Sequence, residues 1–470
     1  MDIRPSAYVA GEWRTSDDTV EITDSTQEQP FARVALASVE DANDAVLAAR
    51  AAFGAWSSTS TAERRQLLEA LADGLAARAE DIAAVASAEV GSTITFSRRV
   101  QAGLPVSVLR TTIEAMDEVD AEERIGHSVV KGLPVGVVSA ITPWNYPLYQ
   151  LMAKLAPALA AGCTAVVKPP QQAPMTTYIL MEEMEKAGFP AGVVNLVQGR
   201  GAVVGEVLAS HPEVDLVSFT GSTGSGARIA ELAARTVKRV SLELGGKSAT
   251  LVTDDADLDV VIPAAVNGFL INNGQTCAAL TRLIVPRRRL AEIEDRLVAE
   301  TAERVVGDPL DEATAVGPLV SRQQRETVLG YVREGLEQHR LLIGGADRPE
   351  GQDRGHFVMP TIFSDVEAGD RLAQEEIFGP VLVVQAVDSD DEGVAVANDS
   401  PYGLSGSVWA SDPERGLALA RRIRTGQVAV NGAPFNPAAP FGGFKQSGYG
   451  RELGRHGIAE YLEPQSVQLP

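Results

Sequence analysis

The sequence has very few cysteines and no long apolar run. Its only cysteines are Cys163 and Cys277. Two cysteines cannot build a disulfide framework, so we expect a reducing compartment, the cytoplasm. The longest apolar stretch, residues 155–167, is broken by Pro157 and Gly162 and is too short to span a bilayer. A transmembrane protein is therefore not expected.

The sequence is also poor in positive charge and in histidine. It has 41 lysines and arginines against 63 aspartates and glutamates, a formal net charge of −22. Such a charge repels nucleic acids and anionic membranes, so we expect neither as a partner. The five histidines show no metal-ligand spacing, so no metal site is predicted. The sequence gives no support for a Cys–His hydrolase. A cysteine and a histidine that only the fold brings together remain an open alternative.

What the sequence does contain is an alternation of strands and helices. A chain of 470 residues predicts two or three domains. Residues 45–53 and 67–75 have helical apolar spacing, so the early chain is expected to be helical. From residue 135 onward, short apolar runs alternate with helical segments, which predicts two parallel sheets in sequence. The predicted strands are residues 135–141, 164–167, 193–197, 216–219 and 240–244, then 249–252, 282–285, 381–387, 406–410 and 427–431.

Cys277 is a candidate nucleophile. It follows a predicted helix over residues 258–271 and lies in Asn273-Gly274-Gln275-Thr276-Cys277-Ala278. A loop position with polar neighbours favours a reactive thiol. The alternative is a buried, inert cysteine, which is the commoner fate of a single cysteine.

Glu243 and Asn145 are candidates for base and oxyanion donor. Glu243 lies among apolar strand residues before a Gly-Gly turn, and burial would raise its pKa into a range useful for a base. The alternative is an exposed charge at a strand end. Asn145 follows a predicted strand, between two prolines that restrict its loop. A rigid amide suits an oxyanion, but an Asx turn is the alternative.

Two glycine-rich turns join strands to helices and are candidate phosphate loops. One is Thr220-Gly221-Ser222-Thr223-Gly224-Ser225-Gly226, whose backbone N–H groups and following helix would suit a pyrophosphate. It lacks the Lys-Ser/Thr pair of a triphosphate site. The rival turn, residues 199–205, resembles a dinucleotide fingerprint, but no acidic residue ends the next strand. Ordinary glycine turns are the alternative for both.

Together these motifs resemble the aldehyde dehydrogenase superfamily, of the NAD(P)-dependent, hydrolytic type, over nearly the whole chain. The matching motifs, in the family's order, are Pro143-Trp144-Asn145, Val167-Lys168-Pro169, Phe219-Thr220-Gly221-Ser222, Glu243-Leu244-Gly245-Gly246-Lys247, Gly274-Gln275-Thr276-Cys277, Glu375-Glu376-Ile377-Phe378-Gly379-Pro380 and Pro440-Phe441-Gly442-Gly443-Phe444-Lys445. A chance match of seven ordered motifs is very improbable.

The resemblance implies a role for each matched residue. Cys277 attacks the aldehyde carbon, and the Asn145 side chain with the Cys277 N–H holds the oxyanion. Hydride passes from the thiohemiacetal to NAD or NADP, and Glu243 activates water to hydrolyse the thioester. The implied cofactor residues are Trp144, Lys168, Gln171, Gly201, Gly221, Ser222, Gly226, Glu376 and Phe378. The implied residues of the substrate pocket are Tyr146, Tyr149, Gln150, Thr276, Ala278, Phe435 and Phe441.

The resemblance also implies an architecture. We expect an α/β fold with two Rossmann-like parallel-sheet domains and a small β bridging element. The cofactor-binding domain would comprise residues 1–112 and 134–245, and the catalytic domain residues 246–445. Residues 113–133 and 446–470 would form the bridging element and C-terminal tail. A homodimer or homotetramer is implied.

One position departs from the family pattern. The family often carries a glutamate at the position of Gln171, where it holds the ribose hydroxyls. Without that negative charge, use of NADP becomes possible beside NAD. The pocket residues include aromatics and no cation, which favours an uncharged aldehyde. Two alternatives to a hydrolytic aldehyde dehydrogenase are a CoA-acylating enzyme and a non-catalytic scaffold protein; the presence of Glu243 with Cys277 and Asn145 argues against both.

Overall fold

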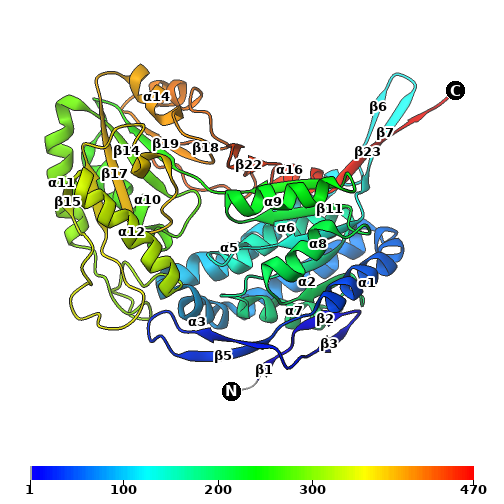
Figure 1. Cartoon of the computed structure of the whole chain (residues 1–470). Helices are drawn as coiled ribbons and strands as arrows, with labels where there is room; N and C mark the ends of the chain where they lie inside the picture. Colours follow the sequence, from blue (N-terminus) through cyan, green and yellow to red (C-terminus); the bar gives the residue numbers. More distant parts are fainter. Residues whose placement is uncertain (1–2) are drawn as a thin grey trace.

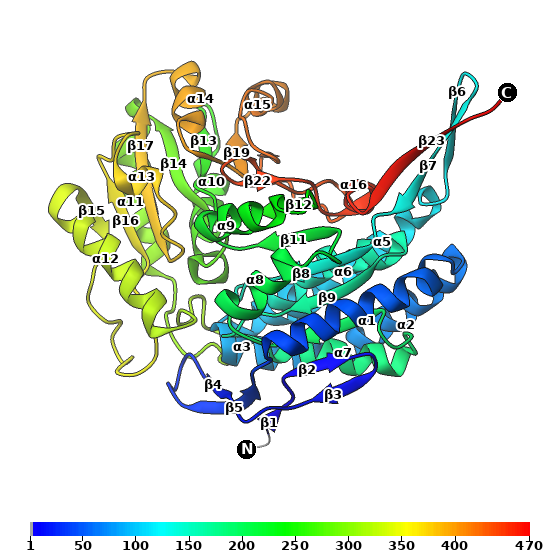
Figure 2. The same ribbon diagram turned by 45° about the vertical axis from the view of Figure 1, so that its right-hand side comes forward.

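The computed structural model describes residues 3–470, apart from the side chain of Glu118. Two α/β bodies lie side by side, and a narrow strand sheet extends away from them (Figure 1). Turning the molecule by 45° keeps this arrangement visible, with the narrow sheet still projecting (Figure 2). None of the helices in the described part of the chain is long and apolar enough to cross a lipid bilayer.

The first large sheet has eight strands in the order β22-β12-β11-β8-β9-β10-β2-β3, of which the central five are parallel. The central strands match those predicted from the sequence. Its strands are β2 (Ala7–Val9), β3 (Glu12–Arg14), β8 (Val137–Ile141), β9 (Thr164–Lys168), β10 (Val194–Val197), β11 (Leu216–Thr220), β12 (Arg239–Glu243) and β22 (Gly448–Tyr449).

Helices cover both faces of this sheet because consecutive residues of its central strands, which point to opposite faces, are both apolar. Val137 and Val217 pack with one set of helices, and Val138 and Leu216 with the other. The first set is α1 (Val39–Ser57), α8 (Glu206–Ser210) and α9 (Thr223–Ala234). The second set is α2 (Thr61–Ala77), α3 (Ala79–Val90), α5 (Gly103–Ala115), α6 (Pro147–Ala161) and α7 (Met175–Ala187).

Before α1 the chain forms strands, which the sequence reasoning missed. A three-stranded sheet of order β1-β5-β4 joins β1 (Ile3–Arg4), β4 (Thr19–Thr23) and β5 (Pro30–Ala35). The helices predicted over residues 45–53 and 67–75 are confirmed in α1 and α2. Both begin at a serine that caps the helix, Ser38 and Ser60, each in a reciprocal capping box.

The second large sheet has seven strands in the order β15-β16-β17-β14-β13-β19-β20, all parallel except β15. Its strands are β13 (Ser248–Val252), β14 (Leu280–Pro286), β15 (Arg340–Ile343), β16 (Thr361–Ser364), β17 (Val381–Val387), β19 (Gly406–Trp409) and β20 (Ala429–Val430). On one face lie α10 (Leu258–Leu270) and α11 (Leu290–Ala302), and on the other lie α12 (Arg322–Gln338), α13 (Arg371–Gln374), α14 (Asp390–Asn398) and α15 (Pro413–Ala420).

The narrow sheet pairs an internal hairpin with the C-terminal strand. Its order is β23-β7-β6, with β6 (Glu122–Ile125), β7 (Ser128–Pro134) and β23 (Leu462–Gln468). The hairpin starts later than residue 113, because α5 continues to Ala115. The remaining elements are α4 (Ile94–Phe96), the π-helix η1 (Ser97–Ala102), η2 (Met116–Glu118), the π-helix η3 (Gly201–Gly205), η4 (Ile271–Gly274), η5 (Arg287–Arg289), β18 (Tyr402–Gly403), β21 (Phe444–Lys445) and α16 (Gly454–Ala459).

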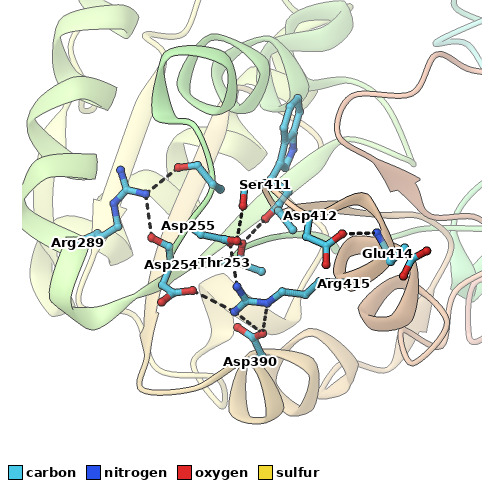
Figure 3. A network of polar contacts seen from close by, with 12 residues as sticks. Thr253, Asp254, Asp255, Arg289, Asp390, Ser411, Asp412, Glu414 and Arg415 are labelled. Carbon is cyan, nitrogen blue, oxygen red and sulfur yellow. Dashed lines mark hydrogen bonds and ion pairs between the residues drawn. The ribbon is translucent and has the colours of Figure 1, made fainter.

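Ion pairs lie at the carboxyl ends of the second sheet. Asp254 and Asp255 follow β13, and the Arg415 guanidinium lies 3.0 Å and 2.9 Å from their carboxylates. The same guanidinium lies 2.6 Å from Asp390, at the start of α14. Figure 3 shows these groups converging between the loops. Charged side chains of the protein itself thus gather at this edge, where Asp254, Asp390 and Arg415 line a cavity of about 590 Å³.

Candidate functional site

A cavity of about 1060 Å³ opens at the carboxyl ends of β8, β9 and β11. Ligands of open α/β sheets bind at this edge. Six of the nine predicted cofactor residues line the cavity: Trp144, Lys168, Gln171, Gly201, Gly221 and Ser222. The volume and the lining suit a dinucleotide.

Helix α9 points its N-terminus at this cavity. Ser222 caps the helix, and its Oγ accepts a hydrogen bond from the Ser225 N–H at 3.3 Å. Gly226 lies in the first turn of α9 and is buried against the segment that follows β12. A Cβ at Gly226 would come within 2.5 Å of the Leu244 side chain, so a larger residue would force that side chain to move. The turn thus keeps free N–H groups and a helix dipole available to a phosphate.

The rival glycine turn faces the same cavity. Gly201 begins the π-helix η3 and lines the cavity together with Gly205. From the sequence, the two turns were alternative phosphate sites. In the structure, both line the same cavity. Arg200, in the same turn, pairs with Asp18 at 2.7 Å on the surface.

Lys168 lies at the end of β9 and is buried. Its Nζ donates to the Pro169 carbonyl at 2.9 Å, and burial lowers the pKa of Lys168 to about 8. Gln171 is only partly buried in the cavity wall. The sequence reasoning missed three carboxylates that line the same cavity: Glu21, Glu28 and Glu206. Glu21 and Glu28 lie far along the chain from the glycine turns of the cavity, whereas Glu206 directly follows Gly205 of one of them.

Cys277 lies in a loop held by buried amides. Asn273 Nδ2 donates to the carbonyls of Gly91 and Pro318 at 2.8 Å and 3.0 Å. The backbone after β12 approaches the loop so closely that a Cβ at Gly246 would lie 2.3 Å from the Cys277 carbonyl oxygen. Cys277 itself is partly exposed, unlike the fully buried Cys163. Of the two cysteines, Cys277 is therefore the one that a ligand can reach.

Asn145 is attached to the same loop. Its Nδ2 donates to the Gln275 carbonyl at 2.9 Å, and the side chain is 3% exposed. The backbone carbonyl of Asn145 accepts hydrogen bonds from Gln101 Nε2 and Asn272 Nδ2 at 2.9 Å and 3.0 Å. The contacts with Asn272 and Gln275 connect Asn145 to residues more than a hundred positions away, which an Asx turn would not do.

Glu243 is buried at the end of β12, with 2% of its surface exposed. Neither carboxylate oxygen has a hydrogen-bond partner within residues 3–470. Burial, and secondly the charge of Glu452, raise the pKa of Glu243 well above its usual value. The surface position considered as an alternative is therefore wrong, and the group has the properties of a buried base.

Electrostatics couple Glu243 to Cys277. The pKa of the Cys277 thiol is raised by burial, and then by the charges of Glu376 and Glu243. The thiol thus needs a proton acceptor to become a thiolate. The sequence did not reveal a buried ion pair near Glu243, in which Lys154 Nζ lies 2.5 Å from Glu452. The charge of Lys154 opposes the rise in the pKa of Glu243.

Glu376 and Phe378 form the other side of the site, before β17. Glu376 Oε1 accepts a hydrogen bond from the Gly246 N–H at 3.0 Å, and burial raises the pKa of Glu376 to about 7. The Phe378 ring meets the Trp144 ring edge to face, with centroids 5.3 Å apart. Through Trp144 these residues adjoin the large cavity, although neither lines it.

The predicted substrate residues gather around Cys277. Tyr146, Tyr149, Phe441 and Ala278 belong with Cys277 to one apolar cluster. The Phe435 ring lies against Phe441, at 6.2 Å between centroids. The Tyr146 hydroxyl is hydrogen-bonded to Thr276 Oγ1 at 2.6 Å.

Two features of this pocket were not foreseen. Gln150 is buried, and its Oε1 has no hydrogen-bond partner in the described part of the chain. Phe96, Val100 and Leu104 also pack against the cluster. Their four-residue spacing was a helical signal, but nothing in it pointed to Cys277.

Comparisons with known proteins agree with this site. Residues 13–467 match the aldehyde dehydrogenase family. A 3-succinoylsemialdehyde-pyridine dehydrogenase of a Pseudomonas species is 43% identical over 98% of this chain and 97% of its own length. Geranial dehydrogenase of Castellaniella defragrans is 42% identical over 98% of both chains. A solved mutant of aldehyde dehydrogenase C from Pseudomonas syringae, with NAD+ and octanal, has a TM-score of 0.97 and 42% identity, covering 99% of this chain and 96% of that one.

Proposed function

This chain belongs to the aldehyde dehydrogenase family, and we propose that it oxidises an aldehyde to a carboxylic acid by covalent chemistry at Cys277. As a member of that family it is an NAD(P)-dependent enzyme. The observation that carries the proposal is the contact between the Asn145 amide and the Cys277 loop, 2.9 Å to the Gln275 carbonyl. It brings a candidate oxyanion donor to a reachable thiol.

The residues take the following parts. Cys277 attacks the aldehyde carbon, which forms a thiohemiacetal. The Asn145 side chain and the Cys277 N–H stabilise its oxyanion, and a fixed amide of this kind needs no reorganisation as charge develops. NAD(P)+, when bound, supplies the hydride acceptor, and the thioester then remains on Cys277. Glu243 takes a proton from the water that hydrolyses the thioester.

The buried carboxylate of Glu243 supports hydrolysis over transfer to CoA. A CoA-acylating enzyme has no use for a base that activates water. The test is an aldehyde panel read by the absorbance of the reduced cofactor, with and without CoA. We expect turnover without CoA, and a strict CoA requirement would overturn the hydrolytic proposal. No cofactor reduction with any aldehyde would favour the non-catalytic alternative.

The cofactor-binding residues fit a dinucleotide. Gly221 and Ser222 supply the phosphate turn at the N-terminus of α9, and Gly201 supplies the second turn. Lys168 and Gln171 lie in the same cavity and would meet the adenosine ribose. Glu376 and Phe378 would position the nicotinamide half. We propose residues 1–112 and 134–245 as the cofactor-binding domain and residues 246–445 as the catalytic domain.

The substrate, assembly and location follow from the surroundings. The cluster around Cys277 is apolar, which suits an aldehyde with an apolar chain next to the carbonyl, as in the octanal complex of the relative.

Exposed Ile125 and Val467 on the narrow sheet support a homodimer or homotetramer formed through it. Light scattering after size-exclusion chromatography would test the assembly. Two free cysteines suit a cytoplasmic location.

A further inference from the structure

A second cavity, of about 460 Å³, lies beside the loop that carries Cys277. Its wall includes Ile271 and Asn272, six and five residues before Cys277, and Phe96 and Arg99 from the helical segment on the opposite side. Nothing in the proposed reaction uses this space. It is distinct from the dinucleotide cavity, with which it shares no lining residue.

The charge of this cavity is opposite to that of the protein. The chain has 63 acidic residues against 41 basic ones. The residues that line the cavity nevertheless include two arginines, Arg99 and Arg304, and no carboxylate. The other lining side chains include uncharged hydrogen-bonding groups such as Thr93 and Asn267.

The guanidinium groups have free hydrogen-bonding capacity. Arg99 is exposed, and its guanidinium group has no hydrogen bond or ion pair with any residue from 3 to 470. Arg304 pairs through one terminal nitrogen with Glu300, but its buried Nε has no partner in the described residues. Most other arginines of this acidic protein have a carboxylate partner, as Arg98 does with Glu80 and Glu312.

The cavity adjoins the pocket of the reactive thiol. Phe96 and Val100 pack against the apolar cluster that includes Cys277, and Arg99 lies between them on η1. The Phe96 ring is 6.1 Å from the Tyr146 ring. The Ile271 carbonyl accepts a hydrogen bond from Thr276 Oγ1 at 3.2 Å. Phe96 and Ile271 thus belong both to the surroundings of Cys277 and to the second cavity. Arg99 lies in a π-helix, an irregularity that recurs at functional sites.

We propose that this cavity is the outer part of the aldehyde site and that Arg99 binds a carboxylate at the far end of the substrate. The favoured substrates are then oxo acids, in which an apolar chain separates the aldehyde from a carboxylate. A guanidinium group offers a carboxylate two parallel hydrogen bonds, which gives both affinity and orientation. The inference rests on the proposed function, because it extends the same substrate site. It replaces the expectation of a wholly uncharged aldehyde, which considered only the residues next to Cys277.

The experiment compares oxo acids with alkanals of equal length. The pairs are 4-oxobutanoate with butanal, 6-oxohexanoate with hexanal, and 8-oxooctanoate with octanal. At the length that reaches Arg99, kcat/KM should be higher for the oxo acid than for its alkanal. Arg99→Gln should raise the KM for that oxo acid about tenfold, because a charge-assisted hydrogen bond is lost. The alkanal should change less than twofold, since it has no group for Arg99 to bind, and Arg99→Lys should be intermediate.

Arg98→Gln is the matched control. Arg98 lies on the same helical turn, but it pairs with Glu80 and Glu312 and does not line the cavity. This variant should keep the wild-type preference. The inference is overturned if no oxo acid is preferred at any length, or if Arg99→Gln behaves as Arg98→Gln does. In both cases oxidation of the alkanals would leave the proposed function standing. If the wild type oxidises neither class, both are wrong.

Discussion

The two parallel sheets meet the site by opposite edges. In the first sheet, β8, β9, β11 and β12 end at the site, so their carboxyl ends carry the cavity and Glu243. In the second sheet, the opposite ends of the strands face the site. Cys277 comes just before β14, and Phe378 just before β17, so the amino ends of these strands face the chemistry.

The carboxyl edge of the second sheet carries ion pairs and none of the motif residues. At its carboxyl ends, where a ligand would be expected, Arg415 pairs with Asp254, Asp255 and Asp390 (Figure 3), and none of the matched motif residues lies there. The rule that ligands bind at carboxyl ends therefore holds for one sheet only. Chemistry occurs where the carboxyl edge of the first sheet faces the amino edge of the second. Five substitutions test this division, in order of decreasing effect.

The largest effect is expected at the amino edge of the second sheet. Cys277→Ala should lower kcat at least about a thousandfold, because no other nucleophile is available to form the thioester. Dinucleotide binding, followed by fluorescence titration, should survive, since it belongs to the first sheet. Cys163→Ala is the control and should stay active. An inactive Cys163→Ala enzyme beside an active Cys277→Ala enzyme would refute the assignment.

Asn145→Ala tests the contact that joins the two edges. Loss of one oxyanion donor should lower kcat by about a hundredfold to a thousandfold, or about 3–4 kcal/mol. Cofactor affinity should barely change. Steady-state kinetics at saturating aldehyde measure the effect. An Asn145→Ala enzyme with full kcat would show that the amide only supports the loop.

Glu243→Gln tests the carboxyl edge of the first sheet. Steady-state kcat should fall about a hundredfold, because the water step loses its base. Rapid mixing should show a burst of reduced cofactor followed by slow turnover. Since burial raises the pKa of Glu243, and only the carboxylate is a base, wild-type turnover should rise as pH rises through that pKa. Glu243→Gln should lack this rise, and turnover at the normal rate would remove Glu243 from the mechanism.

Gln171→Glu tests cofactor choice in the first sheet's cavity. The wild type should accept NADP substantially beside NAD, because Gln171 lacks the charge that repels a 2′-phosphate. The substitution should shift the ratio of kcat/KM values severalfold toward NAD. Arg200→Ala should leave the ratio unchanged, because Arg200 pairs with Asp18. Exclusive use of NAD by the wild type, or a ratio that does not move, would show that Gln171 is not the selectivity residue.

Arg415→Ala should have the smallest effect and should affect only stability. It removes partners of three carboxylates at the carboxyl edge of the second sheet. The guanidinium is about one-third exposed, so we expect a loss of about 1 kcal/mol, seen as a small decrease in Tm. Values of kcat and KM should be unchanged. A large change in either would mean that this edge also takes part in catalysis.

Much of this protein was predictable because local patterns encode local structure. Apolar runs predicted the central strands of both sheets, and helical apolar spacing predicted α1 and α2. The motif residues Asn145, Glu243 and Cys277 were recognisable because their chemistry lies in short, ordered segments. The strands β1, β2 and β3 escaped because they have only two or three residues, and β4 and β5 because charged residues such as Glu21 and Arg33 interrupt their apolar residues.

The tertiary structure decided what depends on residues far apart in the chain. The Lys154–Glu452 pair, the carboxylates Glu21 and Glu28 in the dinucleotide cavity, and the placement of Arg99 beside Ile271 have no local signal. The sequence also could not tell which edge of each sheet faces the site. Burial, pKa and charge balance depend on which side chains packing brings together, whereas the identity of a nucleophile or a base is already present in the chain.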